Sequence, residues 1–427
     1  MIERQQKMKL KTLKRKNKYF YMGVICGVML LTLLIFNTSR AKYRTTQSIE
    51  LARGTINYTV PDLNLVSMYI EDNGTYKGTD TVPQSGYKVN SDKSYCAVNG
   101  NKDTSITFDY SNGKINVNNL TKKGTKCYLY FDVKKLTVQD IIASKTISTR
   151  TDFSTILSTD TTGTIYTAAD DYGTSYYYAG APTDNWVKFG GFYWRIIRIN
   201  GDGTIRMIYN GPTTDQIEYT TQIGQKAFNL NEGDNMYVGY QYTSGEVHGR
   251  GTDSTIKEIL DNWYNNSLKD YSNYIATGNG ANFCNDRTPY SGTGTGDSDT
   301  VYAAQNRLIT NKTPTFKCTD AGDRFATPIG LITADEVAYA GGVDETQNSG
   351  YYLFTGLYYW TMSPSGPGEV FTVAGDYFFY GHGTPEQNGY LRPFPFVCNF
   401  FVRPVINLKA DTQFTSGNGT SSNPYTV

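Results

Sequence analysis

Residues 375–400 contain the densest set of side chains suited to recognising a ligand. Aromatic residues, arginine and asparagine alternate irregularly there with glycine and proline, whereas a strand packed on a core would alternate apolar and polar residues. Rings and arginine on a loop offer large contact area at a small cost in side-chain entropy, as in antibody paratopes. A competing interpretation places about half of these rings in the core of a small β-fold. The candidate ligand-binding residues are Tyr377, Phe379, Tyr380, His382, Glu386, Asn388, Tyr390, Arg392, Phe396, Asn399 and Phe400, with Phe394 in the same run.

Groups for acid–base or nucleophilic catalysis are scarce. The chain has only two histidines, His248 and His382, and both lie in glycine-containing segments where we expect exposed loops. No Gly-x-Ser-x-Gly or His-Glu-x-x-His motif occurs. Asp335 and Glu336 are adjacent on a predicted helix, so they point apart and suit the positive start of that helix better than paired-carboxylate catalysis.

Metal-ligand patterns are weak. No cysteine belongs to a Cys-x-x-Cys motif or has a histidine at zinc-ligand spacing. The pairs Asp297/Asp299 and Asp320/Asp323 could offer oxygens to calcium, but they lack the register of an EF-hand, and a solvated loop is the favoured interpretation. We therefore expect no metal site and no cofactor.

The cysteines predict an oxidising compartment. Of six cysteines, Cys26 lies in an apolar run near the amino terminus and Cys398 is the odd one among the rest, most often a buried thiol. The other four allow three connectivities, and local pairing is the simplest. The expected disulfides are Cys96–Cys127 and Cys284–Cys318.

The amino terminus has the pattern of a membrane signal. Residues 1–18 are polybasic, and Tyr19–Phe36 is an uncharged run of 18 residues. As a helix this run spans about 27 Å, close to the roughly 30 Å hydrocarbon core of a bilayer. The basic flank predicts that the amino terminus stays inside and that the rest of the chain is outside the cell membrane. An uncleaved single-pass signal anchor is favoured over cleavage after Ala41.

Charge excludes nucleic acid as the expected partner. The net charge is +1, but residues 1–44 hold eleven basic residues and one acid, which leaves 29 basic and 38 acidic residues and a net charge of −9 on the rest. A mildly acidic body does not suit the binding of phosphate backbones.

The remaining sequence predicts an α+β, mostly β protein with two folded parts. Short β-type runs at turn-separated intervals over 45–136 indicate a small disulfide-bonded β-sandwich. Thr137–Lys145 has a good N-cap and predicts a short helix, and a Ser/Thr-rich linker follows within 137–169. Residues 170–427 form the second, larger domain, in which dense aromatic segments begin.

Three segments of the second domain carry clear signals. Trp186–Ile199 and Thr204–Tyr209, joined by a glycine-containing turn, predict a hairpin with one face in a core. Thr255–Tyr264 places Ile256, Ile259, Leu260 and Trp263 on one helical stripe. Thr333 with Glu336 forms a capping box that opens a short helix ending at Gly341-Gly342. The four tryptophans, on amphipathic elements, are expected in cores.

Several of these segments carry a family resemblance. The stretches FGGFYWRIIRINGDGTIRMIYNG, FCNDR, GLITADEVAYAGG, YYLFTGLYYWTMSPS and VRPVINLKAD, in this order, resemble a family of uncharacterised exported proteins of Gram-positive gut bacteria. The resemblance covers about 170–427, and 45–136 resembles the small β-domain that often precedes it. The terminal part is similar to C-type-lectin-like folds, including formylglycine-generating enzymes. This implies a C-terminal C-type-lectin-like domain, although the Glu-Pro-Asn, Gln-Pro-Asp and Trp-Asn-Asp motifs of calcium-dependent lectins are absent.

Three functions are compatible with these features. The first is a membrane-anchored, non-catalytic surface protein that presents a lectin-like module to an extracellular protein or glycan, for adhesion or ligand binding. The second is a structural envelope or pilus-like component that associates through Cys398 or a strand edge. The third is a cell-envelope enzyme, whose pocket would use Arg195, Asp286, Arg287 or Asp335.

Overall fold

The computed structural model describes residues 56–57, 65–72, 74–83, 86–111, 113–122, 124–215, 218–375 and 389–427. The chain forms two compact units, Met1–Lys134 and Lys135–Val427, which are treated separately below. The predicted membrane segment 19–36 lies outside the described residues. Among the residues that are described, no helix is both long and apolar enough to span a bilayer.

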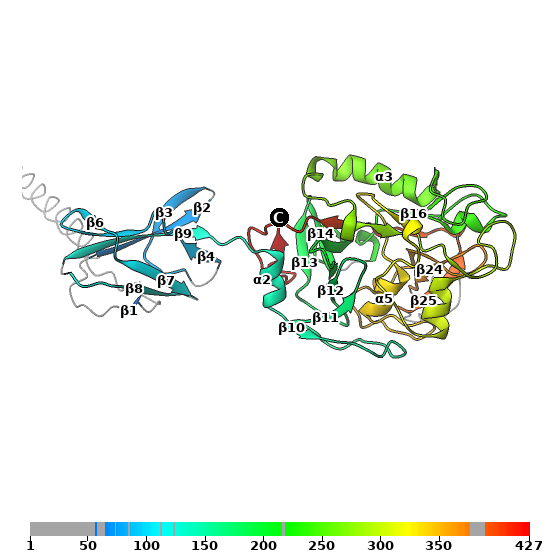
Figure 1. The fold of residues 1–427 in the computed structure, drawn as a ribbon, viewed down its shortest axis with the longest axis horizontal. Helices are drawn as coiled ribbons and strands as arrows, with labels where there is room; N and C mark the ends of the chain where they lie inside the picture. Colours follow the sequence, from blue (N-terminus) through cyan, green and yellow to red (C-terminus); the bar gives the residue numbers. More distant parts are fainter. Residues whose placement is uncertain are drawn as a thin grey trace, which may run out of the picture. The chain divides into compact units, whose positions relative to one another are not determined.

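The first unit has two β-sheets (Figure 1). In the larger sheet the order is β3-β2-β9-β5-β6, with β4 also paired to β9, and in the smaller it is β1-β8-β7. The larger sheet contains β2 (Leu65–Asp72), β3 (Thr75–Thr79), β4 (Tyr87–Val89), β5 (Tyr95–Val98), β6 (Asn101–Asp103) and β9 (Thr125–Val133). The smaller contains β1 (Ile56–Asn57), β7 (Thr107–Ser111) and β8 (Lys114–Asn118).

Side-chain alternation explains how these two sheets pack. On β9, Cys127, Leu129 and Phe131 are buried at every second position, and on β8 Ile115 and Val117 follow the same period. Met68, Ile115, Leu129 and Phe131 share one apolar cluster, which joins the large sheet to the small one. The two-layer arrangement agrees with the sandwich expected from the sequence.

The second unit is built on an eight-stranded sheet. Its main path is β10-β11-β12-β14-β13-β28, and β15 joins β14 to β27. The pairing of β13 with β28 brings the carboxyl end of the chain into the same sheet. The strands are β10 (Thr146–Ser148), β11 (Thr164–Ala169), β12 (Thr174–Tyr177), β13 (Trp186–Phe189), β14 (Phe192–Ile199), β15 (Ile205–Gly211), β27 (Val405–Leu408) and β28 (Tyr425–Thr426).

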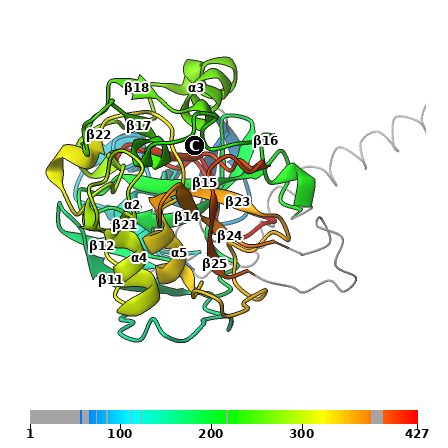
Figure 2. The ribbon, with the colours of Figure 1, turned by 90° about the vertical axis from the view of Figure 1, so that its right-hand side faces the viewer.

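A five-stranded sheet of order β16-β26-β23-β24-β25 forms the other main layer. Figure 2 shows β23, β24 and β25 side by side, and α5 (Ala334–Ala340) contacts all three. Proline at 393 and 395 fits β25 because this strand is at the sheet edge, where a missing backbone N–H costs no ladder bond. The strands are β16 (Gln225–Lys226), β23 (Tyr359–Pro364), β24 (Glu369–Val373), β25 (Leu391–Pro395) and β26 (Phe400–Phe401).

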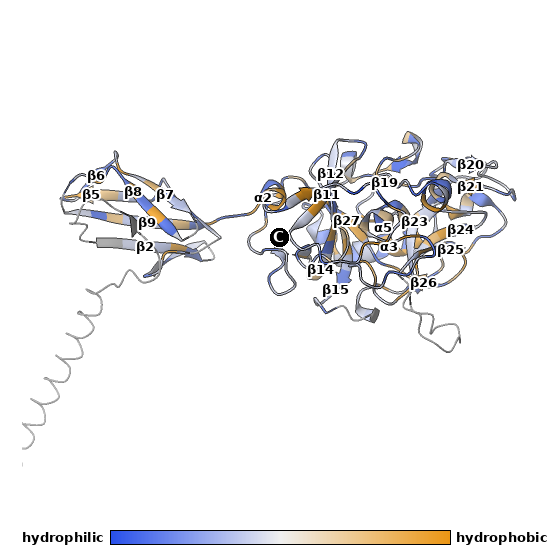
Figure 3. Cartoon of the chain, turned by 90° about the horizontal axis from the view of Figure 1, so that it is seen from below, coloured by the Kyte–Doolittle hydropathy of each residue, from blue (hydrophilic) through white to orange (hydrophobic). Residues whose placement is uncertain are grey.

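Short ribbons and helices complete the second unit. The ribbons pair β17 (Gln241–Tyr242) with β18 (Thr252–Asp253), β19 (Phe283–Cys284) with β22 (Arg324–Phe325), and β20 (Pro289–Ser291) with β21 (Val301–Tyr302). The helices, besides α5, are α2 (Val138–Ala143), α3 (Thr255–Ser267) and α4 (Ala303–Gln305), the last followed by a π turn over Asn306–Thr310. Figure 3 shows apolar residues along the strands of both units.

The expected fold class, α+β and mostly β, is confirmed, and so are several local predictions. The helices at 137–145, 255–264 and 333–341 form, with capping boxes at Thr137 and Thr333. Both predicted disulfides are present, Cys96–Cys127 and Cys284–Cys318. Three tryptophans are buried, and Trp263 packs half-buried against Phe192 and Tyr209.

Two expectations about organisation differ from the structure. Residues 137–169 do not act as a linker: Val138, Ile141 and Ile165 pack in the core of the second unit, and β10 and β11 belong to its large sheet. The predicted strand Trp186–Ile199 is itself a hairpin that reverses at Gly190-Gly191, and its second arm, β14, is buried on both faces from Trp194 onward. The alternation of Tyr193 and Arg195 against Trp194 and Ile196 therefore does not mark an exposed face, because β14 lies in the middle of the sheet.

The disulfide of the first unit generates a stability prediction. Cys96 on β5 is directly opposite Cys127 on β9, their Cα atoms are 4.0 Å apart, and both side chains are fully buried. Replacing both cysteines by serine is expected to lower the free energy of unfolding of this unit by about 2–4 kcal/mol, because the unfolded chain loses its cross-link. Calorimetry of the full chain should show a lower melting temperature for one transition only. A shift of both transitions, or of neither, contradicts the prediction, since the second unit keeps Cys284–Cys318.

Candidate functional site

A charged pocket lies in the second unit beside the Cys284–Cys318 disulfide. About 570 Å³ of space, its open mouth included, is lined by residues of β14, β15, α5 and the loops around the disulfide. The lining is unusual because five acidic and five basic side chains meet in it. These are Asp170, Asp171, Asp286, Asp335 and Glu336, with Arg198, Arg206, Arg307, Lys317 and Arg324.

Two arginines on neighbouring strands share one glutamate on a helix. Arg198 on β14 and Arg206 on β15 are register partners, so their side chains leave the sheet on the same face. Glu336 lies in the first turn of α5, where its Oε1 accepts from Arg198 Nε at 3.0 Å and lies 2.6 Å from Arg206 Nε. Its Oε2 accepts the backbone N–H of Thr333 at 3.0 Å and closes the capping box.

A fourth charge extends this cluster. Asp170 Oδ2 lies 3.2 Å from Arg198 Nη1 and also accepts from Ser175 Oγ at 2.7 Å and from the backbone N–H of Gly201 at 2.8 Å. Arg198, Arg206, Asp170 and Glu336 are all buried, and their formal charges sum to zero. Ions removed from water are stable only when paired and hydrogen-bonded in this way.

The titration of these groups is set by two opposing effects. Burial favours the neutral form of Glu336, but Arg206 and Arg198 outweigh burial and hold its pKa below the ordinary value. Burial likewise opposes ionisation of Asp170, and hydrogen bonds from Gly201 and Ser175 prevail and lower its pKa. Burial lowers the pKa of Arg206 to about 10 although Glu336 favours its charged form. All three groups therefore remain charged near neutral pH.

A second set of ion pairs lies in the same pocket. Arg307 donates from Nε to Asp335 Oδ1 at 2.7 Å and from Nη2 to Asp335 Oδ2 at 2.5 Å, and Nη2 also pairs with Asp286. Asp286 Oδ1 accepts from Thr319 Oγ1 at 2.9 Å, and Asp335 Oδ1 accepts the backbone N–H of Thr315 at 2.9 Å. Burial opposes the charge of Arg307, but the two carboxylates outweigh it and raise its pKa. Burial raises the pKa of Asp335 in spite of Arg307.

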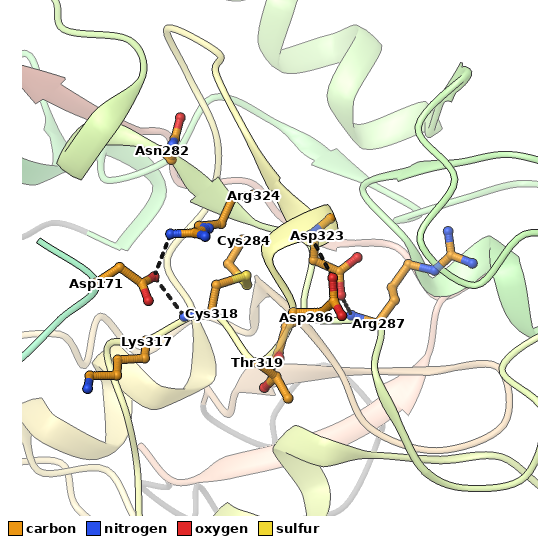
Figure 4. Close-up of a disulfide and its surroundings, with 12 residues drawn as sticks. Asp171, Asn282, Cys284, Asp286, Arg287, Lys317, Cys318, Thr319, Asp323 and Arg324 are labelled. Carbon is orange, nitrogen blue, oxygen red and sulfur yellow. Dashed lines mark hydrogen bonds and ion pairs between the residues drawn. A yellow bond between two sulfur atoms is a disulfide. The ribbon is translucent and has the colours of Figure 1, made fainter.

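Figure 4 shows the disulfide that forms one wall of the pocket. Asp171 points toward Arg324, whose Nη1 is 3.7 Å from Asp171 Oδ2, and the same oxygen accepts the backbone N–H of Cys318 at 3.1 Å. The disulfide thereby fixes the loop that carries Thr315 and Thr319 close to the carboxylates that they donate to. In the described part of the chain, no group of three or more His, Cys, Asp or Glu side chains could hold a metal ion.

The four residues named for an enzyme do not form one site. Asp286 and Asp335 meet through Arg307 in the charged pocket. Arg287 is buried apart from them and donates to the backbone carbonyls of Glu246 and Gly249. Arg195 lines a different groove. Both oxygens of Asp286 and of Asp335 have donors, and this arrangement stabilises loops more readily than it activates a nucleophile.

The contact that His248 makes could not be predicted from the sequence. Its side chain is 33% exposed, and Nδ1 lies 3.1 Å from Oδ2 of Asp323, which is buried. Burial raises the pKa of Asp323 although His248 and the backbone N–H of Arg287 favour the charged form. The expectation of a simply exposed loop histidine is therefore incomplete, because its partner is 75 residues away in the chain.

The predicted ligand-binding segment is only partly described. Tyr377, Phe379, Tyr380, His382, Glu386 and Asn388 lie outside the described residues. Tyr390 and Arg392 are half-buried next to each other, with Arg392 Nη1 3.3 Å from the Tyr390 hydroxyl, and Asn399 is exposed. These three remain candidates.

Phe396 and Phe400, the other two described candidates, are 5% and 3% exposed and belong to the main apolar core of the second unit. Phe400 packs against Tyr358, Trp360 and Phe394 at centroid distances of 5.0–5.3 Å. The strand pairing of β26 with β16 and β23 turns this ring inward, as the competing core interpretation expected for about half of the rings.

Cys398 has no disulfide partner and is half-buried, and burial raises its pKa. A thiol of this kind is mostly protonated near neutral pH, so it is a poor nucleophile.

By its fold the protein belongs to the α+β, mostly β class and carries two disulfides. Compared with protein-family models, with curated proteins and with solved structures, the chain has no match in any of the three.

The shared glutamate generates a matched pair of stability predictions. Glu336→Gln removes the only carboxylate that contacts both Arg198 and Arg206 in the described structure, so we expect the second unit to lose about 3–5 kcal/mol of unfolding free energy. Asp335→Asn, at the neighbouring position of the same helix turn, leaves Asp286 paired with Arg307 and is expected to cost on the order of 1–2 kcal/mol. Denaturant unfolding of both variants tests this order. Equal losses would show that the shared glutamate has no special role.

The lowered pKa of Glu336 predicts the acid sensitivity of the second unit. Because the folded pKa lies below the unfolded value of about 4.3, its stabilisation is complete above that value and is lost as the pH falls through the folded pKa. Asp323 and Asp335, with raised pKa values, act in the opposite direction. Denaturant unfolding between pH 6 and 3 should therefore give a smaller loss of stability in Glu336→Gln than in the unchanged chain. Parallel pH profiles would contradict the assignment.

Proposed function

We propose that the protein is a membrane-anchored surface protein that binds an extracellular protein or glycan through its second unit and is not an enzyme. The single observation that carries this proposal is the construction of the β24–β25 hairpin, which holds both ends of the aromatic segment 376–388. A rigid scaffold that holds the ends of a ring-rich connection is the usual architecture of a recognition loop.

The hairpin is fixed along its whole length. Five consecutive pairs join β24 to β25, from Glu369 opposite Pro395 to Val373 opposite Leu391. Beyond the last pair, Ala374 accepts from Gly389 and donates to the carbonyl of Tyr390, both at 2.9 Å. The two ends of the segment are thus held together by backbone hydrogen bonds.

Glycines at both ends let the chain pass close to a neighbouring loop. A Cβ at Gly375 would lie 2.4 Å from the backbone of Leu357 and Tyr358. A Cβ at Gly389, which has a φ of +70°, would lie 2.0 Å from the carbonyl oxygen of Asn348. Gly375 and Gly389, which flank the segment, therefore both lie against the 348–358 loop.

The proposed location rests on the apolar run 19–36 together with the two disulfides. Disulfides persist in oxidising compartments, and each unit contains one. A single-pass anchor with both units outside the cell accounts for the run and for the disulfides together. The likeness of the second unit to C-type-lectin-like domains is part of this proposal and is supported by the order of its sequence motifs.

A non-catalytic role is supported by the ion pairs of the charged pocket. Its buried arginines and carboxylates pair with one another and so stabilise the folded structure. The alternatives of a structural envelope component or an enzyme have no comparable support from a specific contact.

The proposal predicts that recognition depends on the segment between β24 and β25. Full-length protein in nanodiscs would be screened on arrays of glycans and cell-surface proteins, beside the triple variant Tyr377→Ala, Tyr380→Ala and His382→Ala. Binding should fall at least about tenfold, a loss of 1.4 kcal/mol or more, with the melting temperature unchanged.

A matched control removes exposed aromatic rings elsewhere. Tyr271→Ala with Tyr274→Ala changes two exposed rings that pack on Phe189 and should leave binding intact. Equal losses in both variants, or none in the triple variant, would overturn the assignment of the segment. If the protein binds nothing on any array, a structural role is favoured instead.

A further inference from the structure

A second groove in the second unit, separate from the charged pocket, has an arginine in its wall. Its cavity volume is about 730 Å³, which is within the range of small-molecule pockets. Its lining comes from the 181–186 turn, from β14 and from the 349–356 loop. Of the candidate ligand-binding residues that the structure describes, none lines it.

Arg195 is the buried charged residue of this groove, and no ion pair compensates for the loss of its hydration. The residue is 3% exposed, yet no carboxylate in the described structure forms a salt bridge with it. Asp184 is near enough to favour its charge, but Oδ2 of Asp184 is bonded to Lys145 at 2.5 Å and to the backbone N–H of Gly163 at 2.8 Å. Burial lowers the pKa of Arg195 to about 9, so it is still charged at neutral pH. This contrasts with Arg198 three residues later, which has two carboxylate partners.

The geometry leaves one edge of the guanidinium available. Nε donates to Asn185 Oδ1 at 2.6 Å and Nη2 donates to the carbonyl of Pro182 at 2.7 Å. Nη1 has no acceptor among the described residues. The other two bonds hold the plane of the group still, and a fixed guanidinium with a free donor is suited to a carboxylate.

Two aromatic rings flank this guanidinium. Its carbon lies 4.2 Å from the ring centroid of Trp186 and 5.2 Å from that of Tyr352. Stacking on two rings supports a cation in a desolvated position without neutralising it. The charge that would neutralise it must therefore come from the groove.

The rest of the groove is rich in hydroxyl groups. Thr183, Thr214, Ser349, Thr355 and Ser421 line it. The Oγ1 of Thr355 is buried and has no partner in the described structure, which is the state expected of a group that a ligand or an ordered water completes. One acidic residue, Asp215, lies on the lining and is exposed, so its charge is screened by solvent.

We propose that this groove binds an acidic saccharide, with a sugar carboxylate paired to Nη1 of Arg195 and sugar hydroxyls bonded to the rim of threonines and serines. A single buried cation accounts for one carboxylate, and the five threonine and serine residues of the lining account for sugar hydroxyls. The proposal rests on the groove residues named above and not on the proposed function of the segment 376–388.

Full-length protein in nanodiscs would be titrated by isothermal calorimetry with trigalacturonic acid and with 3′-sialyllactose. The matched ligand controls are the methyl esters of both acidic sugars, which keep every sugar unit and lack the carboxylate charge. We expect at least one of the acidic sugars to bind at least tenfold more tightly than its neutral counterpart. Equal binding of acid and ester, or no binding of either acidic sugar, overturns the proposal.

Protein variants distinguish a loss of binding at the groove from a general loss of folding. Arg195→Gln should abolish the preference for the acid, but it also removes two structural hydrogen bonds. Ser349 is exposed on the rim, so Ser349→Glu should fold normally and weaken binding of the acid at least threefold by repulsion, whereas Ser349→Gln should not. If Ser349→Glu binds the acid as tightly as Ser349→Gln, the groove is not the binding site.

Two further outcomes are informative. The triple variant at 377, 380 and 382 should bind the acidic sugar normally; a loss there would place the saccharide at the loop and overturn the groove. Inorganic phosphate that displaces the sugar at equal concentration would show a plain anion site and would also overturn the saccharide assignment.

Discussion

The second unit depends on one constraint, the neutralisation of two buried arginines that face the same side of the large sheet. Arg198 and Arg206 lie opposite each other on β14 and β15, and an uncompensated pair of buried cations would be strongly destabilising. Glu336 and Asp170 together remove this penalty, and Glu336 contributes from the first turn of α5, so the helix must dock with its amino end over these strands. The capping box that starts the helix and the ion pairs that dock it use the two oxygens of one carboxylate. Local helix formation and tertiary packing are thereby coupled through a single residue.

The same helix turn also organises the disulfide loop. Asp335 pairs with Arg307 and receives the backbone N–H of Thr315, and Asp286 near Cys284 is held by Arg307 and Thr319. The disulfide and these ion pairs therefore restrain one loop from two directions. Charges that pair with one another in this way stabilise the fold of the pocket and its loops.

Ligand binding needs polar groups that are not already paired with other groups of the fold. The hairpin β24–β25 fixes the ends of an aromatic segment through backbone bonds and two glycines, and Arg195 is kept charged between two rings without a carboxylate. Arg195 and Arg198 are three residues apart on one strand and differ in their surroundings. Arg198 pairs with two buried carboxylates, whereas Arg195 lines a groove. Their residue type is identical, so only the surroundings separate a structural arginine from a binding one.

The local elements of this protein could be predicted from its sequence. They are the hairpin at 192–211, helix α3, the capping box of Thr333 with Glu336 and the two short-range disulfides, which follow from patterns that span a few tens of residues. Long-range packing could not: Glu336 reaches Arg198 across 138 residues, Phe400 lies in the core, and residues 137–169 join the second unit. The physical reason is that periodicity reports which side of an element is apolar, whereas pairing of charges and burial of particular rings depend on which distant segment covers that side.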